Sequence, residues 1–128
     1  MHVKLVPHPE RSGHFTLTPY GPIDSDTYLD FREKIKSLFI LATKGVVIDL
    51  ENVEYISSAG LGVLFTLKKH CKQNGGDLIF CNLKPQIKRL FEIVNALPKE
   101  TLFKDAAEAD AYLYRMMNKA IDKDRGLN

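Results

Sequence analysis

A short, nearly continuous apolar run at residues 46–50 constrains the fold more than any other feature of this sequence. The run reads VVIDL, and such a β-branched stretch is typical of a strand that is covered on both faces in an α/β sheet. Segments with apolar residues at helical spacing lie before and after it. Strands that alternate with helices are joined by right-handed crossovers between parallel neighbours. The chain is therefore predicted to form a mixed, mostly parallel sheet with helices packed against it.

Other parts of the chain continue this alternation. Residues 3–6 and 15–18 alternate apolar and polar side chains, which predicts two strands joined by a turn that can add an antiparallel portion to the sheet. A helix is predicted from Ser25 to Leu41, because apolar residues recur at helical spacing after the capping oxygens of residues 24–26. The elements expected after residue 50 are a helix that begins near Gly60 and ends at residues 74–76, a strand at Asp77–Cys81, a helix opened by Pro85, a brief strand at residues 101–103, and a last helix opened by Asp105 and Glu108.

Length and charge restrict the class of protein. A chain of 128 residues buries roughly two-thirds of the surface of its unfolded form, which predicts a single domain without structural metals or disulfides. Its 18 Lys and Arg against 16 Asp and Glu give a net charge of +2, which argues against nucleic acid as a partner. The longest apolar run, residues 38–42, is too short for membrane insertion, and no signal segment is present. We therefore expect a cytoplasmic protein in which Cys71 and Cys81 are free thiols.

Motifs for catalysis and cofactor binding are absent from the sequence. Residues 60–62 lack the third glycine of a dinucleotide-binding loop, and Ser58 lacks the glycine two positions earlier that a hydrolase elbow requires. His2, His8 and His14 lie six residues apart, on a segment expected to be mobile, and match no set of metal ligands. We therefore expect no enzyme activity, no cofactor and no metal site, since no base or oxyanion partner for Ser58 can be named.

Two hydroxyl groups lie where a predicted strand gives way to a helix. The first N–H groups of a helix are unpaired and carry partial positive charge, so a phosphate on Ser57 or Ser58 would be stabilised there. Ala59, Gly60 and Gly62 are small, which would let the backbone of a kinase approach the hydroxyl. A purely structural interpretation remains open, because serine is a favoured N-cap and glycine eases the packing of a helix on a sheet.

The sequence around these serines is similar to that of a known family. Residues 46–64, VVIDLENVEYISSAGLGVL, resemble the signature of STAS domains, and specifically of the bacterial anti-sigma factor antagonists. The resemblance covers most of the chain. It implies a STAS-like single α/β domain at residues 1–117, with four to five strands and about four packed helices, and a polar tail at residues 118–128. The other segments that match are residues 21–24, 74–78 and 86–91.

The resemblance also implies a function. In this family an anti-sigma factor that is a serine kinase phosphorylates the serine at the start of the second helix, which matches Ser58. The unphosphorylated antagonist binds the anti-sigma factor and thereby frees the sigma factor, and a metal-dependent serine phosphatase resets the switch. Asp24 matches the acidic residue that lies near the phosphorylated serine in this fold, although it also fits a simple capping role. The remaining residues expected beside the phosphate or the partner are Ser57, Ala59, Gly60, Leu61 and Gly62.

Two positions depart from the family pattern. Many phosphorylated members have aspartate immediately before the acceptor, where this chain has Ser57, and the change makes Ser57 a possible alternative acceptor. Ala59 replaces a residue with a hydroxyl group and removes a third candidate.

A second function remains open beside the switch. The chain could be a non-switching STAS subunit of a lipid-transport ATPase or of a signalling scaffold, in which Ser57 and Ser58 only cap a helix. For a switch, the expected binding surface is the face around Asp24, the serine loop and the exposed side of the following helix. Lys68 and Lys69 belong to that helix, although such lysines are more usually solvated charges.

Overall fold

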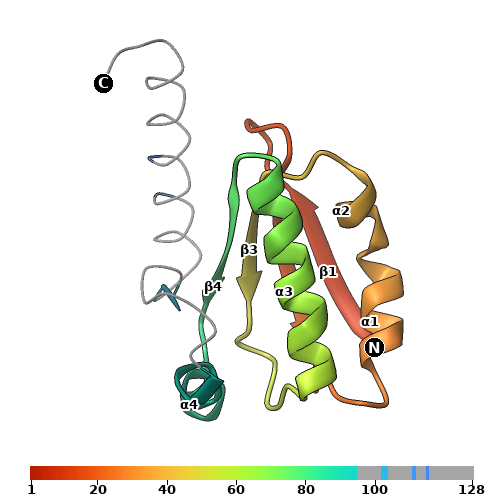
Figure 1. Cartoon of the computed structure of the whole chain (residues 1–128), viewed down its shortest axis with the longest axis vertical. Helices are drawn as coiled ribbons and strands as arrows, with labels where there is room; N and C mark the ends of the chain where they lie inside the picture. The colour runs from red at the N-terminus through yellow and green to blue at the C-terminus, as the bar shows by residue number, and fades with distance from the viewer. Residues whose placement is uncertain (95–101, 104–110, 112–114, 116–128) are drawn as a thin grey trace.

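The fold is built on a five-stranded mixed sheet with the strand order β1-β2-β3-β4-β5. β1 and β2 are antiparallel, and the pairs from β2 to β5 are parallel (Figure 1). This confirms the predicted mixed, mostly parallel sheet. The computed structural model describes residues 1–94, 102–103, 111 and 115, so the polar tail and all of the predicted last helix except residues 111 and 115 lie outside the described residues. The elements are β1 (His2–Pro7), β2 (His14–Tyr20), α1 (Tyr28–Lys34), α2 (Lys36–Ile40), β3 (Gly45–Asp49), α3 (Ser58–Gln73), β4 (Asp77–Cys81), α4 (Pro85–Val94) and β5 (Leu102–Phe103).

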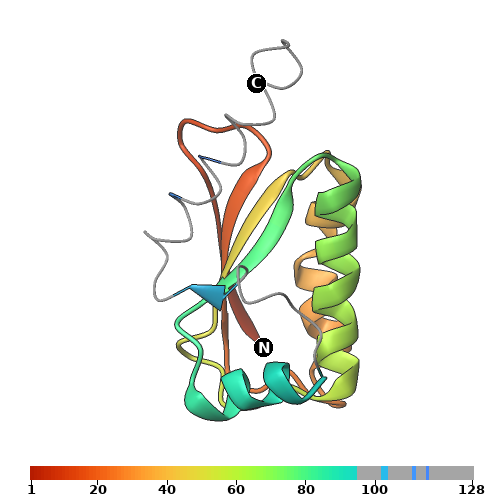
Figure 2. The same cartoon turned by 60° about the vertical axis from the view of Figure 1, so that its left-hand side comes forward.

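The helices α1, α2 and α3 pack against one face of the sheet, and α4 lies beyond the carboxyl end of β4 (Figures 1 and 2). Alternate residues of β3 and β4 enter the core between the sheet and these helices, among them Val46 and Phe80. Val47 and Ile79 point to the opposite face and are buried as well. Burial of both faces is the environment that the continuous apolar run at residues 46–50 predicts. None of the helices within the described ranges combines the length and hydrophobicity that a membrane crossing requires.

The first predicted helix is interrupted in the structure. Residues 25–27 form a turn, α1 begins at Tyr28, and a break at Ile35 separates α1 from α2. The Leu38 N–H donates to the Ile35 carbonyl at 3.0 Å, an i,i+3 bond that tightens the turn. Ile35 and Leu38 are both fully buried. The single helix predicted over residues 25–41 is therefore wrong in detail, because packing into the core favours a tighter turn than the apolar spacing indicates.

Lys68 is not a solvated helix charge, although Lys69 beside it is exposed. Lys68 as a whole residue is 8% exposed. Its Nζ lies 2.6 Å from Asp77 Oδ1 and donates to the Leu78 carbonyl at 3.0 Å. Desolvation lowers the pKa of Lys68, and the hydrogen bond that Lys68 donates to Asp77 opposes that shift. The ion pair ties the middle of α3 to the start of β4, so Lys68 is a structural residue.

Cys71 and Cys81 are not joined by a disulfide, as the sequence predicts, and both are buried. Cys71 lies on the core face of α3, where burial raises the pKa of its thiol from 9.0 to about 12.

The raised pKa of Cys71 predicts a specific loss of stability in alkali. The unfolded thiol ionises above pH 9.0 while the folded thiol stays protonated, so the folded state binds more protons and stability falls as pH rises. Between pH 8 and pH 10 the wild-type protein should lose about 1.4 kcal/mol more than Cys71→Ala, whose cavity penalty does not depend on pH. Urea unfolding of both proteins at the two pH values measures the difference. Parallel pH profiles for the two proteins would contradict the assignment.

Candidate functional site

The two loops that carry the predicted site are joined by backbone hydrogen bonds. The loop between β2 and α1 and the loop between β3 and α3 meet in an isolated parallel bridge of Ile23 with Ile56. The Ile23 N–H donates to the Tyr55 carbonyl at 2.9 Å, and the Ser57 N–H donates to the Ile23 carbonyl at 2.8 Å. Asp24 is thus the next residue after Ile23, whose backbone holds Ser57. The structure brings together two loops whose proximity the family resemblance had suggested.

Ser57 is the N-cap of α3. Its backbone is extended, with φ −81° and ψ 172°, and its Oγ accepts a hydrogen bond from the Gly60 N–H at 3.2 Å. This is the standard arrangement in which a serine hydroxyl satisfies one of the unpaired donors of a helix. The hydroxyl of Ser57 is thus engaged in holding the start of α3.

Ser58 occupies the first position of α3 and is exposed. Its hydroxyl makes no hydrogen bond within the part of the chain that the structure describes. The first turn of α3 contains no acidic residue, so no side chain within that turn offsets the partial positive charge at this end of the helix. An anion on Ser58 would lie in solvent reach and at the end of the helix that favours negative charge.

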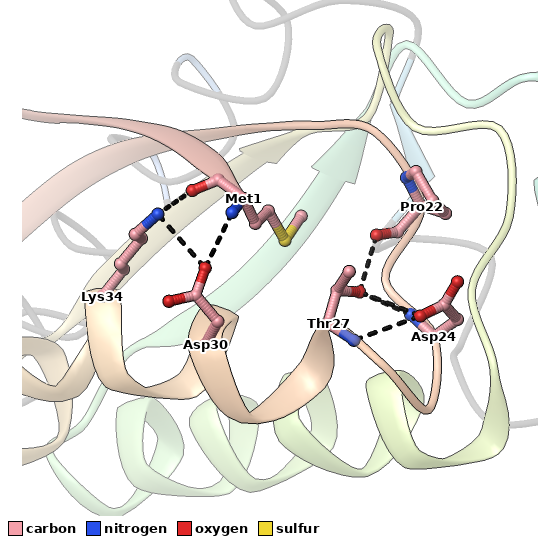
Figure 3. Close-up of polar contacts among 6 residues, drawn as sticks. All are labelled: Met1, Pro22, Asp24, Thr27, Asp30 and Lys34. Carbon is pink, nitrogen blue, oxygen red and sulfur yellow. Dashed lines mark hydrogen bonds and ion pairs between the residues drawn. The ribbon is translucent and has the colours of Figure 1, made fainter.

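Asp24 organises the turn that enters α1 (Figure 3). Its Oδ1 accepts from the N–H groups of Asp26 at 2.9 Å and Thr27 at 3.1 Å. The Asp24 N–H donates in return to Thr27 Oγ1 at 2.9 Å, and that hydroxyl donates to the Pro22 carbonyl at 2.8 Å. Thr27 is the N-cap of α1 and makes no side-chain cap bond, so Asp24 closes the turn before the helix and, contrary to the capping role that the sequence suggested, does not cap the helix itself. The same bonds hold its carboxylate on the loop that is bridged to Ser57.

The glycines and the leucine that follow the serines have different surroundings. A Cβ on Gly60 would lie 2.6 Å from the Ile23 carbonyl oxygen and 2.8 Å from Ile23 Cγ2, so the close contact of α3 with the bridged loop depends on glycine. A Cβ on Gly62 would meet nothing within 4 Å. Leu61 is buried in the core. Of these three, only Gly62 lies on a surface that another molecule could touch.

A groove of about 700 Å³ opens beside the serine loop, between α1 and α2 on one side and α3 on the other. No local pattern in the sequence indicates this groove, because its two walls come from separate helices whose side chains meet only after folding. Two of the residues predicted for the site, Ala59 and Gly62, lie in its lining. The lining residues are Tyr28, Arg32, Glu33, Lys36, Phe39, Ile40, Ala59, Gly62, Val63 and Thr66.

The histidines of the N-terminal segment do not assemble a metal centre. His14 lies on β2 and is buried, so the expectation that it belongs to a mobile segment is wrong. No group of three or more His, Cys, Asp or Glu side chains is placed to hold a metal ion among the residues that the structure describes.

Comparison with known proteins agrees with this architecture. A sequence model of the STAS domain matches residues 6–109. This chain belongs to the STAS domain family.

Two relatives are named as antagonists of anti-sigma factors. The putative anti-sigma factor antagonist BtrV of Bordetella bronchiseptica is 48% identical over 48 residues, which is 38% of this chain and 41% of that protein. The anti-sigma-B factor antagonist of Staphylococcus aureus is 33% identical over 73 residues, which is 57% of this chain and 68% of that protein.

Solved structures of SpoIIAA share the fold. The unphosphorylated form of this anti-sigma factor antagonist covers 98% of this STAS chain and matches over 99% of its own length, with a TM-score of 0.63 and 19% identity. The phosphorylated form of the Bacillus protein covers 95% of this chain and matches over 98% of its own length, with a TM-score of 0.64 and 15% identity. The predicted STAS-like fold is thus confirmed.

The two glycines of α3 provide a matched test of the close contact with Ile23. Gly60→Ala should lower the free energy of unfolding by about 2 kcal/mol, because its methyl group overlaps the Ile23 backbone. Gly62→Ala should raise it by about 1 kcal/mol, because alanine is the better helix former and the methyl group enters open space. Urea unfolding of both variants checks the prediction. Equal effects of the two substitutions would show that the loop does not press on Gly60.

The two serines should also respond differently to substitution. Ser57→Ala removes the cap of α3 and should lower the free energy of unfolding by about 1 kcal/mol. Ser58→Glu adds a negative charge at the positive end of the helix and should raise it by about 0.5 kcal/mol at low salt. Thermal unfolding at low and high salt tests both, since salt should remove only the gain at Ser58. A gain that persists at high salt would contradict the electrostatic explanation.

Proposed function

We propose that this STAS protein is an anti-sigma factor antagonist that is switched by phosphorylation of Ser58. The unphosphorylated form binds an anti-sigma factor with serine-kinase activity and so releases a sigma factor for transcription. The protein acts as ligand and substrate, and catalyses nothing itself. The single observation that carries the proposal is the contrast between Ser57, whose hydroxyl caps α3, and Ser58, whose hydroxyl is exposed beside it.

The division of roles between the serines supports Ser58 over Ser57 as the acceptor. Ser57 is half-buried and its Oγ faces the Gly60 N–H, so transfer of a phosphoryl group to it would require the side chain to turn out of the cap. Phosphorylation of Ser58 needs no such rearrangement. In the reaction the γ-phosphoryl group of ATP is transferred to the Ser58 oxygen, ADP leaves, and the hydroxyl proton is released. A metal-dependent serine phosphatase then returns the hydroxyl by hydrolysis.

The consequence of phosphorylation is electrostatic. A phosphoserine carries about 1.5–2 negative charges near neutral pH and must be desolvated if it lies in an interface. A penalty of about 3 kcal/mol weakens binding roughly a hundredfold. Ser57 in place of the aspartate of many family members leaves the first turn of α3 without an acidic side chain. Within that turn the change of charge is therefore produced by the phosphate.

A non-switching STAS subunit of a transport ATPase or scaffold is the alternative. In that role both serines would be needed only to cap the helix. Because Ser57 already provides the cap, the alternative leaves the exposed hydroxyl of Ser58 without a purpose.

The acceptor can be identified by mass spectrometry of protein isolated from its host. Phosphate should appear on Ser58, should vanish in Ser58→Ala, and should persist in the matched control Ser57→Ala, which keeps the acceptor and loses only the cap. The isolation should include conditions in which phosphatase activity is blocked. If Ser58 stays unmodified under these conditions, the switch is wrong and the non-switching subunit becomes the better hypothesis; phosphate on Ser57 would reverse the assignment of the acceptor.

A further inference from the structure

The groove beside α3 is long and has an exposed apolar lining, which the packing of the fold does not require. Its lining follows α3 from Ala59 to Thr66, about two turns or 10 Å of helix. The opposite wall contains Phe39 and Ile40, and Ile40 leaves 78% of its surface exposed. With Phe39 and Val63 it forms one continuous apolar part of the lining, and a contiguous exposed apolar surface is typical of an interaction site.

Gly62 lies in the same groove, and no internal contact explains it. Glycine is a poor helix former, yet a Cβ at this position would meet nothing within 4 Å. Gly60, two residues earlier, is required by the Ile23 backbone. The missing side chain at Gly62 therefore leaves space in the groove for a side chain of another molecule.

The charges at the rim of the groove indicate what kind of molecule fits. Lys36 Nζ lies 2.6 Å from Glu33 Oε1, so these two charges offset one another. Arg32 makes no ion pair with any residue that the structure describes. The rim thus offers one uncompensated positive charge beside an apolar surface. A second copy docked here about a twofold axis would present the same rim, whose one acidic residue, Glu33, is already paired with Lys36, so charge complementarity does not favour self-association through this face.

We propose that the groove between α1, α2 and α3 binds an amphipathic helix of the anti-sigma factor, with its apolar stripe over Gly62 and Ile40 and an acidic flank facing Arg32. A helix laid in a groove between helices places apolar anchors at i, i+3, i+4 and i+7, which suits the two-turn length of this wall. The inference rests on the proposed function, because that function supplies the partner.

The position of the groove couples helix docking to the phosphorylation site. Ala59 lines the end of the groove that lies next to Ser58 in the chain. A phosphate on Ser58 places negative charge at this end, and it opposes the acidic flank that Arg32 attracts. The same partner segment is therefore attracted before phosphorylation and repelled after it.

Photo-crosslinking in the host cell identifies the occupant directly. The crosslinking amino acid p-benzoylphenylalanine replaces Lys36 at the rim of the groove, or, as a control, Lys4, an exposed residue of the edge strand β1 that is not part of the groove lining. We expect a crosslink from position 36 to an amphipathic segment with acidic residues in another protein, and none from position 4. A crosslink to a second copy of this chain, or none from position 36, overturns the proposal.

Substitutions then measure the contribution of the groove to the affinity of the full-length protein for the partner so identified. Ile40→Gln and Gly62→Leu should each weaken binding at least about tenfold, as expected for the centre of an interface. Leu29→Gln changes an α1 residue that is 60% exposed but outside the groove, and should stay within about twofold. Arg32→Glu should weaken binding most strongly at low salt. Unchanged binding by Ile40→Gln and Gly62→Leu, both measured as folded protein by circular dichroism, overturns the proposal.

Failure of the groove and failure of the switch give different results. If Ser58 is phosphorylated and its phosphate blocks binding while the groove variants bind normally, the switch stands and the groove proposal is wrong. If the groove variants lose binding but Ser58 stays unmodified, the groove stands and the proposed switch is wrong.

Discussion

The backbone of Ile23 joins the two loops on which the site depends. Its N–H and carbonyl bond to Tyr55 and Ser57, so the loop before α1 and the loop before α3 form one unit. This contact is close enough that only glycine fits at position 60. The Asp24 turn and the Ser57 cap are both attached to this bridge. The position of Ser58 is therefore set by the backbone hydrogen bonds of its neighbours, and its own side chain takes no part in them.

α3 carries this arrangement into the core. Its buried face packs through Leu64 and Leu67 against the sheet, and Lys68 anchors its middle to the start of β4 through Asp77. The opposite face carries Ser58 and forms one wall of the groove. A helix held along one side in this way presents its other side as a fixed surface. Under the proposed switch, a phosphate therefore changes the charge of this surface, and the partner senses the change in its binding energy.

The sequence predicted the elements whose patterns are local. The runs at residues 46–50 and 77–81 have the composition of covered strands and form β3 and β4, because a strand buried on both faces needs continuous apolar sequence. The break at Ile35 and the burial of Lys68 were not predicted. Both depend on partners distant in the sequence, since Ile35 and Leu38 turn toward a common core and Lys68 reaches residues on the next strand.

The sequence by itself determined the alternation of strands and helices, the family, and the placing of two serines at a helix start, because these are properties of periodicity and of a contiguous motif. Only the tertiary structure decided which serine is the cap, which glycine is required by packing, and that α1, α2 and α3 enclose a groove. Those features arise between segments that are far apart in the chain. Side-chain spacing describes one face of one element, whereas a contact such as that of Gly60 with Ile23 depends on how two elements are packed together.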